Sequence, residues 1–191
     1  MKHPMNRFKD IPIIVSNAVN YLSIHGPKTE GIFRLSGKMQ TIEEIKTSYD
    51  RGVPIDFQNE TEVHAIAGIL KLYLRELPDP LLCFSSYKQW IESYCPTDIE
   101  GTKHKMKVLL GQLPTINRNI LALLMRLCAA ITVHSAENKM TFSNLAICLA
   151  PNILKAPDES LTLALMDAGT VNGVVAMFIQ YYVDFFGEER T

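Results

Sequence analysis

One arginine lies on a short segment that glycines enclose. Residues 31–37 read GIFRLSG, which places Arg34 between Gly31 and Gly37. The glycines allow sharp turns or positive φ, and the apolar side chains Ile32, Phe33 and Leu35 can anchor the segment to a core. Arg34 is then a long polar side chain that can reach into a partner. A solvated loop arginine is the alternative, which this segment alone leaves open.

Two further cations and three asparagines are the other polar side chains in promising positions. Lys71 and Arg75 are four residues apart in a segment with helical periodicity, so they should point the same way. The asparagines lie next to apolar segments, at Asn138, Asn144 and Asn152. Each has a structural alternative, which is an exposed helix face for the cations and a cap, turn or satisfied helix residue for the amides.

The sequence contains no self-contained active site that we recognise. G-x-S-x-G, G-x-G-x-x-G and Walker motifs are missing. The five histidines have no spacing that would place two of them on one metal, and we expect His64 and His134 to be hydrogen-bonded structural residues. Glu43 and Glu44 are adjacent and do not converge, and residues 41–44 fit a capping box. We therefore expect that the protein binds no metal ion and has no cofactor of its own.

Composition is that of an ordinary globular domain. The 191 residues are 47% hydrophobic and 20% charged, with a formal net charge of -1, so the chain offers no bulk field for nucleic acid or anionic membrane. The four cysteines form no C-x-x-C pair, which favours thiols in a reducing compartment. We find no run with the span of a membrane helix and expect a cytoplasmic protein.

Apolar residues recur every three or four positions almost throughout, which predicts an all-α domain of about eight or nine helices. We expect one domain over residues 11–187, with an N-terminal tail or non-native start at 1–10 and a C-terminal tail at 188–191. Pro151 and Asn152 are expected to end one helix, and 155–160 to form a loop. The expected helices are 12–25, 38–52, 62–76, 87–94, 102–112, 115–136, 142–150 and 170–186.

Three blocks in order resemble the Rho GTPase-activating (RhoGAP) domain family. They are EGIFRLSG at 30–37, LKLYLRELPDPLL at 70–82, and NKMT at 138–141 followed by Asn144-Leu-Ala and Pro151-Asn152. The resemblance covers about residues 11–154. The departures are Ala150, where the family often has glycine, and Gly68, which should cost about 1 kcal/mol of helix propensity unless it allows close packing.

The resemblance implies a role for each candidate residue. Arg34 would be the finger inserted into a Rho-type GTPase, where a guanidinium stabilises charge that develops during GTP hydrolysis. Lys71 would contact the GTPase switch region, and Arg75 would brace the finger loop or the interface. Asn144 would support the loop and lie against the GTPase, ahead of Asn152 in rank, and Asn138 would be structural. GTP and Mg²⁺ would belong to the partner.

Three functions remain open on the sequence. The first is a monomeric domain that stimulates a Rho, Rac or Cdc-type GTPase and thereby affects the actin cytoskeleton, with recruitment to membranes through other domains or the partner. The second is an adaptor that binds such a GTPase without stimulating it, against which the presence of Arg34 argues. The third is a self-contained hydrolase, for which we can name no nucleophile and base.

Overall fold

The computed structural model describes residues 11–53, 55, 57, 62–157 and 161–187, which are entirely helical and irregular, without a strand. This confirms the all-α prediction, with ten α-helices among these residues. A 3-10 helix at Phe84–Ser86 precedes α4. The α-helices are α1 Ile13–His25, α2 Met39–Asp50, α3 Val63–Arg75, α4 Tyr87–Ser93, α5 Ile99–Gln112, α6 Thr115–Thr132, α7 Ser135–Asn138, α8 Phe142–Ile153, α9 Leu161–Gln180 and α10 Tyr182–Phe186.

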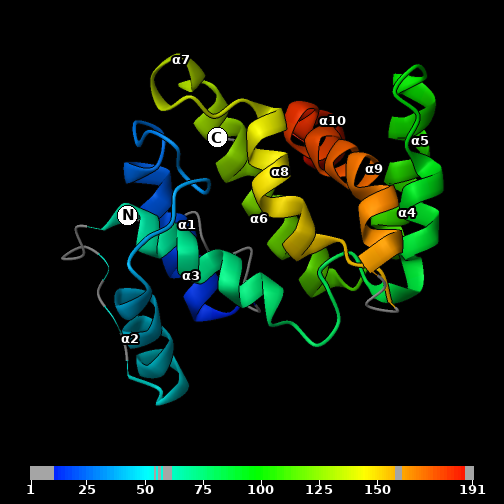
Figure 1. The fold of residues 1–191 in the computed structure, drawn as a ribbon. Helices are drawn as coiled ribbons and strands as arrows, with labels where there is room; N and C mark the ends of the chain where they lie inside the picture. The colour runs from blue at the N-terminus through cyan, green and yellow to red at the C-terminus, as the bar shows by residue number, and fades with distance from the viewer. Residues whose placement is uncertain (1–10, 54, 56, 58–61, 158–160, 188–191) are drawn as a thin grey trace.

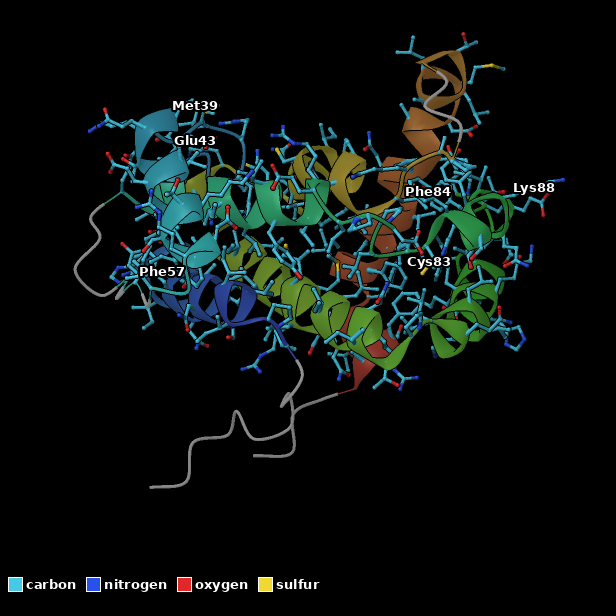
Figure 2. The ribbon with its side chains drawn as sticks, turned by 90° about the horizontal axis from the view of Figure 1, so that it is seen from below. Met39, Glu43, Phe57, Cys83, Phe84 and Lys88 are labelled. Atoms are coloured by element: carbon cyan, nitrogen blue, oxygen red, sulfur yellow. The ribbon has the colours of Figure 1, made fainter. Side chains whose placement is uncertain are left out.

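Two groups of helices meet on a central layer of α6 and α8 (Figure 1). On one side α1 packs against α3 and α6, and α2 covers α3 at the edge of the domain. On the other side α9 packs along α8 and also contacts α4 and α6. Figure 2 shows Met39 of α2 and Lys88 of α4 at opposite ends of the molecule. As expected, α6 is a core helix, with Ile120, Leu124 and Ile131 buried.

Close packing explains the glycine inside α3. A Cβ at Gly68 would lie 2.6 Å from Cδ1 of Ile42, which comes from α2. Ile42 is buried, so the missing side chain lets α2 approach α3 closely. The close contact between α2 and α3 therefore offsets the loss of helix propensity expected for Gly68.

Two predicted helices are each broken in the structure. The helix expected over 115–136 ends at Thr132, and α7 follows from Ser135. The break is stabilised because the amide of Asn138 donates to the carbonyl of Ile131 at 2.8 Å. The helix expected from residue 170 starts at Leu161 and ends at Gln180, and α10 follows it. Its first turns were missed because Leu165 and Met166 are exposed and give no amphipathic stripe.

Helix ends differ from the predictions at two places. Pro151 does not end α8, which continues to Ile153, and the N–H of Leu154 donates to the carbonyl of Ala150 at 3.0 Å. Buried Ile153 and Leu154 hold this last turn. The helix α5 starts three residues early because Asp98 caps it, accepting from the N–H of Gly101 at 2.9 Å.

The capping box predicted at 41–44 is wrong, since α2 already begins at Met39. The carboxylate of Glu62 takes its place, accepting from the N–H of Lys38 at 2.6 Å and from the hydroxyl of Thr41 at 3.4 Å. The cap therefore comes from a residue 24 positions away in the chain, beside the first turn of α3. Such a tertiary cap leaves no local pattern in the sequence.

A helix with the length and composition of a membrane span does exist, contrary to the sequence expectation. Thr162–Gln180 has a mean hydropathy of 1.5, and 39% of that window is buried. Its Val174, Val175 and Phe178 are buried against the rest of the domain. A helix that packs into a protein core passes the same test as a membrane span, so we assign α9 to the core.

The cysteines are free thiols, as expected. Cys83 and Cys128 are buried, whereas Cys95 and Cys148 are partly exposed. Burial raises the pKa of Cys128 strongly, which suits an inert core thiol. The predicted tails 1–10 and 188–191, and residues 158–160 of the predicted loop, lie outside the described residues, so these boundaries stay predictions.

Candidate functional site

The segment around Arg34 has an unusual backbone. Gly31 and Phe33 both have positive φ, 65° and 66° respectively. Glycine adopts this conformation readily, but a bulky residue such as Phe33 seldom does, and the cost is about 1–3 kcal/mol. Ile32 and Phe33 are fully buried, whereas Leu35 is 50% exposed and does not anchor the loop as expected. Arg34 follows the strained residue and is exposed.

Two hydrogen bonds from distant elements hold this loop. The ammonium of Lys71, on α3, donates to the carbonyl of Phe33 at 2.7 Å. The N–H of Gly31 donates to the carbonyl of Asn138, at the end of α7, at 2.8 Å. Both residues with positive φ are therefore tied to the rest of the domain. The backbone is fixed immediately before Arg34, which is itself exposed.

Gly37 ends the loop where the backbone must approach α3. A Cβ there would lie 2.3 Å from the backbone nitrogen of Ala65 and 2.5 Å from its Cα. Backbone atoms cannot move aside as a flexible side chain can. Any larger residue at this position would therefore push the loop away from α3.

Asn138 is a structural residue, as expected. It is fully buried, and its amide donates to the carbonyl of Pro27 at 2.7 Å and to that of Ile131 at 2.8 Å. Its side-chain oxygen accepts from the N–H of Met140 at 2.8 Å. Together with the bond from Gly31, these contacts join the end of α6, the segment after α1 and the loop that carries Arg34.

Asn144 supports the turn that follows Asn138 through an exposed hydrogen bond. Its side chain donates to the carbonyl of Lys139 at 3.0 Å, and its N–H donates to the hydroxyl of Thr141, the N-cap of α8, at 3.2 Å. Lys139 has a positive φ of 61° and directly follows Asn138. Asn144 therefore supports the turn whose carbonyl holds Gly31, one step away from the loop itself.

Lys71 and Arg75 lie on the same side of the loop. Lys71 braces the loop through the carbonyl of Phe33, and Arg75, one turn further along α3, is exposed. The contacts with a GTPase that the resemblance implied for both stay predictions. Both residues line a hollow of about 320 Å³ with Phe33, Leu35 and Asn152. Asn152 lies in the last turn of α8 and donates to the carbonyl of Cys148 at 3.3 Å. Lys71, Arg75 and Asn152 thus lie beside the loop, on α3 and α8, whereas Asn144 is one step away from it.

The positive charges of Lys71 and Arg34 lie close to the same part of α8. Burial raises the pKa of the Cys148 thiol, and the positive charges of Lys71 and Arg34 oppose that rise. Both cations therefore lie near Cys148 on α8. Among the described residues, no group of three or more His, Cys, Asp or Glu side chains could hold a metal ion. The arrangement places positive charge beside the exposed Arg34 loop.

Within the described part of the chain, neither His64 nor His134 forms the side-chain hydrogen bond expected of it. The expectation of hydrogen-bonded histidines is wrong for His64, whose Nδ1 is buried without a hydrogen-bond partner. Nδ1 of His134 lies 4.0 Å from a carboxylate oxygen of Glu137, which is too long for a hydrogen bond.

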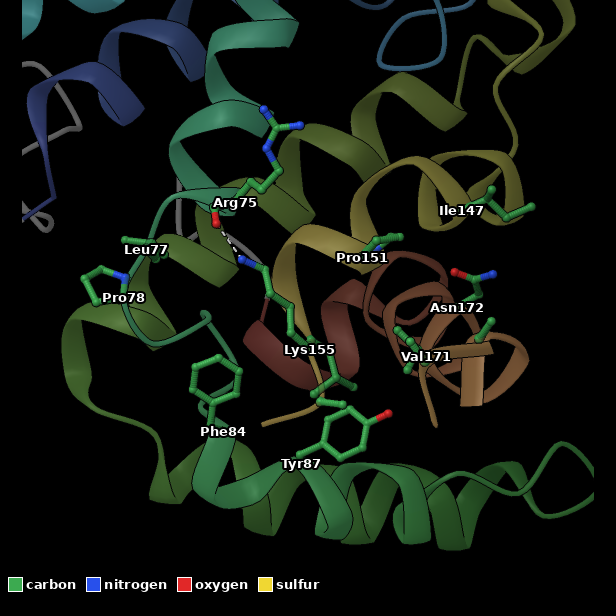
Figure 3. A pocket seen from close by; sticks show the side chains of 14 residues that line it. Arg75, Leu77, Pro78, Phe84, Tyr87, Ile147, Pro151, Lys155, Val171 and Asn172 are labelled. Carbon is green, nitrogen blue, oxygen red and sulfur yellow. Dashed lines mark hydrogen bonds between the residues drawn. The ribbon is translucent and has the colours of Figure 1, made fainter. Parts of the chain in front are cut away.

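Sequence reasoning missed Lys155. Its ammonium donates to the carbonyl of Arg75 at 2.5 Å, beside a pocket of about 560 Å³ (Figure 3). The two residues are 80 positions apart, and no local pattern links them.

Comparisons with known proteins agree with this architecture. A family model described as the RhoGAP domain matches residues 12–158. Rho GTPase-activating protein gacJJ of Dictyostelium discoideum is 35% identical over 187 residues, which are 95% of this chain and 21% of that protein. Rho GTPase-activating protein 1 of Homo sapiens is 36% identical over 178 residues, which are 93% of this chain and 39% of that protein.

A solved structure shows the same fold. The crystal structure of human Rho GTPase activating protein 15 matches with a TM-score of 0.87 and 25% identity, covering 93% of this chain and 84% of that chain. The chain spans only about a fifth to two fifths of the two curated relatives above. The match over residues 12–158 covers most of the helices described here, and the chain belongs to the RhoGAP domain family.

Proposed function

We propose that this domain binds a GTP-loaded Rho-family GTPase and accelerates GTP hydrolysis by inserting Arg34 into the partner's active site. The observation that carries the proposal is the exposed Arg34 on a strained loop tied to α3 and α7 at Phe33 and Gly31. The names of the relatives, which are Rho GTPase-activating proteins, support the same activity.

The chemistry that Arg34 would supply is electrostatic. GTP hydrolysis spreads negative charge over the transferred phosphoryl group and the leaving oxygen, and a planar guanidinium can stabilise both. In other GTPases an arginine supplied in trans raises the rate by roughly 10³ to 10⁵, which corresponds to about 4 to 7 kcal/mol. GTP and Mg²⁺ would be bound by the partner, so the domain acts as an activator and catalyses nothing alone.

The contact surface would surround the loop. Lys71, Arg75, Asn144 and Asn152 would lie at its polar part, and Met39, which is 65% exposed, at its apolar part. A mixed surface of this kind is typical of transient protein–protein interfaces. We expect the domain to act as a monomer in the cytoplasm, reaching membranes through its partner or through other domains.

Single-turnover hydrolysis by purified Rho, Rac and Cdc-type GTPases tests the proposal. The chain is compared with Arg34→Ala and with Arg51→Ala, an exposed arginine at the far end of α2. We expect stimulation that collapses in Arg34→Ala while binding survives, and no change in Arg51→Ala. Binding without stimulation would indicate the adaptor function, and full stimulation by Arg34→Ala would show that another residue is the finger.

A further inference from the structure

Lys155 carries a charge that no acidic side chain among the described residues neutralises. It follows the end of α8, is partly buried, and donates to the carbonyl of Arg75 at 2.5 Å. Burial, and then the positive charge of Arg75, lower the pKa of Lys155. A partly desolvated cation next to a second cation is unfavourable unless an anion compensates it.

Three described acidic residues near the pocket already have partners. They are Glu76 with the ammonium of Lys46 at 2.7 Å, Asp79 with the N–H of Phe84 at 2.8 Å, and Asp167 with the hydroxyl of Tyr87 at 2.8 Å. Within the part of the chain that the structure describes, Lys155 forms no ion pair. A carboxylate on a bound partner can supply the missing charge.

Apolar side chains form most of the pocket that Lys155 crosses. Figure 3 shows Leu77, Pro78, Phe84 and Val171 around its side chain. The volume of about 560 Å³ lies within the range of roughly 300 to 1,000 Å³ that is usual for binding pockets. The site therefore fits an apolar group that has a carboxylate beside it.

The pocket is continuous with the surface around Arg34. Arg75 lines both this pocket and the smaller hollow beside Phe33 and Leu35. Ile147 of α8 lines the large pocket and is 57% exposed. A GTPase that covers Arg34 and Arg75 would therefore also cover Lys155.

We propose that Lys155 is a specificity-determining residue, which selects those Rho-type GTPases whose facing surface carries a carboxylate beside an apolar side chain. This inference rests on the proposed function. Because the charge lies away from Arg34, it contributes equally to binding the ground state and the transition state. Its effect is therefore on KM and not on kcat.

Kinetics of the 191-residue chain with the Rho, Rac and Cdc-type GTPases test this role. The variants are Lys155→Gln, Lys155→Glu and Lys155→Arg, and Lys88→Gln serves as the matched control. Lys88 is on α4, is 87% exposed and points away from the domain (Figure 2). Affinity for each GTPase loaded with a non-hydrolysable GTP analogue is measured in parallel, so that binding is read without turnover.

For the preferred GTPase we expect Lys155→Gln to raise KM and Kd about tenfold, and Lys155→Glu to raise them further, with kcat within about twofold. Lys155→Arg should stay near the unmodified chain, and the difference between Lys and Gln should shrink at high salt. Unchanged KM and Kd in Lys155→Glu for every GTPase would overturn the inference while leaving the proposed function intact. Failure of the unmodified chain to bind any of these GTPases would overturn both.

Discussion

The ammonium of Lys71 lies 2.7 Å from the carbonyl of Phe33, the residue immediately before Arg34. Phe33 is buried with a φ of 66°, so this bond supports a backbone conformation that a bulky residue rarely adopts. In the free domain Lys71 therefore acts on the loop that presents Arg34. The strained backbone and the hydrogen bond that supports it are both at Phe33. A bond at this residue, immediately before Arg34, is well placed to pre-organise the arginine.

Replacing Lys71 should slow the stimulated reaction. A hydrogen bond from a charged donor contributes about 1.5 to 3 kcal/mol, so we expect Lys71→Gln to lower the stimulated rate about ten- to a hundredfold at saturating domain. Lys88→Gln, which removes an exposed lysine far from the loop, should not change it. Single-turnover hydrolysis measures both. A variant that keeps the full rate and loses only affinity would place the main role of Lys71 at the partner's switch region.

Replacing Asn138 should destabilise the whole domain. Asn138→Ala leaves the carbonyls of Pro27 and Ile131 and the N–H of Met140 without a side-chain partner, which we expect to cost about 3 to 5 kcal/mol. Asn144→Ala removes one exposed bond and should cost only about 1 kcal/mol. Urea unfolding curves give both values. Similar losses for the two variants would contradict the structural role of Asn138.

Two glycine substitutions should have opposite effects. Gly37→Ala places a Cβ 2.3 Å from the backbone nitrogen of Ala65, so we expect a loss of stability and a displacement of the loop that carries Arg34. Gly111→Ala, in α5, meets nothing within 4 Å and should gain up to about 1 kcal/mol from helix propensity. Thermal unfolding compares the two variants with the unmodified chain. Equal stability of Gly37→Ala would mean that the loop and α3 are less closely packed than described.

Tyr87 should make stability fall at alkaline pH. Burial, followed by the hydrogen bond and charge of Asp167, raises the pKa of Tyr87 to about 12 from its usual value of about 10. The folded state then holds the phenolic proton more tightly than the unfolded state, so this contribution is complete below about pH 10 and decreases up to about pH 12. Urea unfolding at pH 9 and pH 11 should show a smaller decrease in Tyr87→Phe. An identical decrease in both proteins would assign the effect to other groups.

The local pattern of the sequence was enough to predict most of the helices. Apolar residues at three- and four-residue spacing identify α1, α2, α3 and α6 because burying one helix face is the main source of their stability. The same rule fails for the first turns of α9, where exposed Leu165 and Met166 interrupt it. It also fails at the break between α6 and α7, where a buried amide from Asn138 competes for the carbonyl of Ile131.

The sequence by itself determined the all-α class, the three motif blocks and the choice of Arg34 as the candidate functional arginine. Helix periodicity and residue order are local properties, so they can be read without a structure. The tertiary structure alone decided what surrounds that arginine. Lys71 reaches Phe33 across 38 residues, and Lys155 reaches Arg75 across 80. Glu62 caps α2 from 24 residues away. Such contacts depend on how the helices pack, and packing brings together residues that no short-range pattern connects.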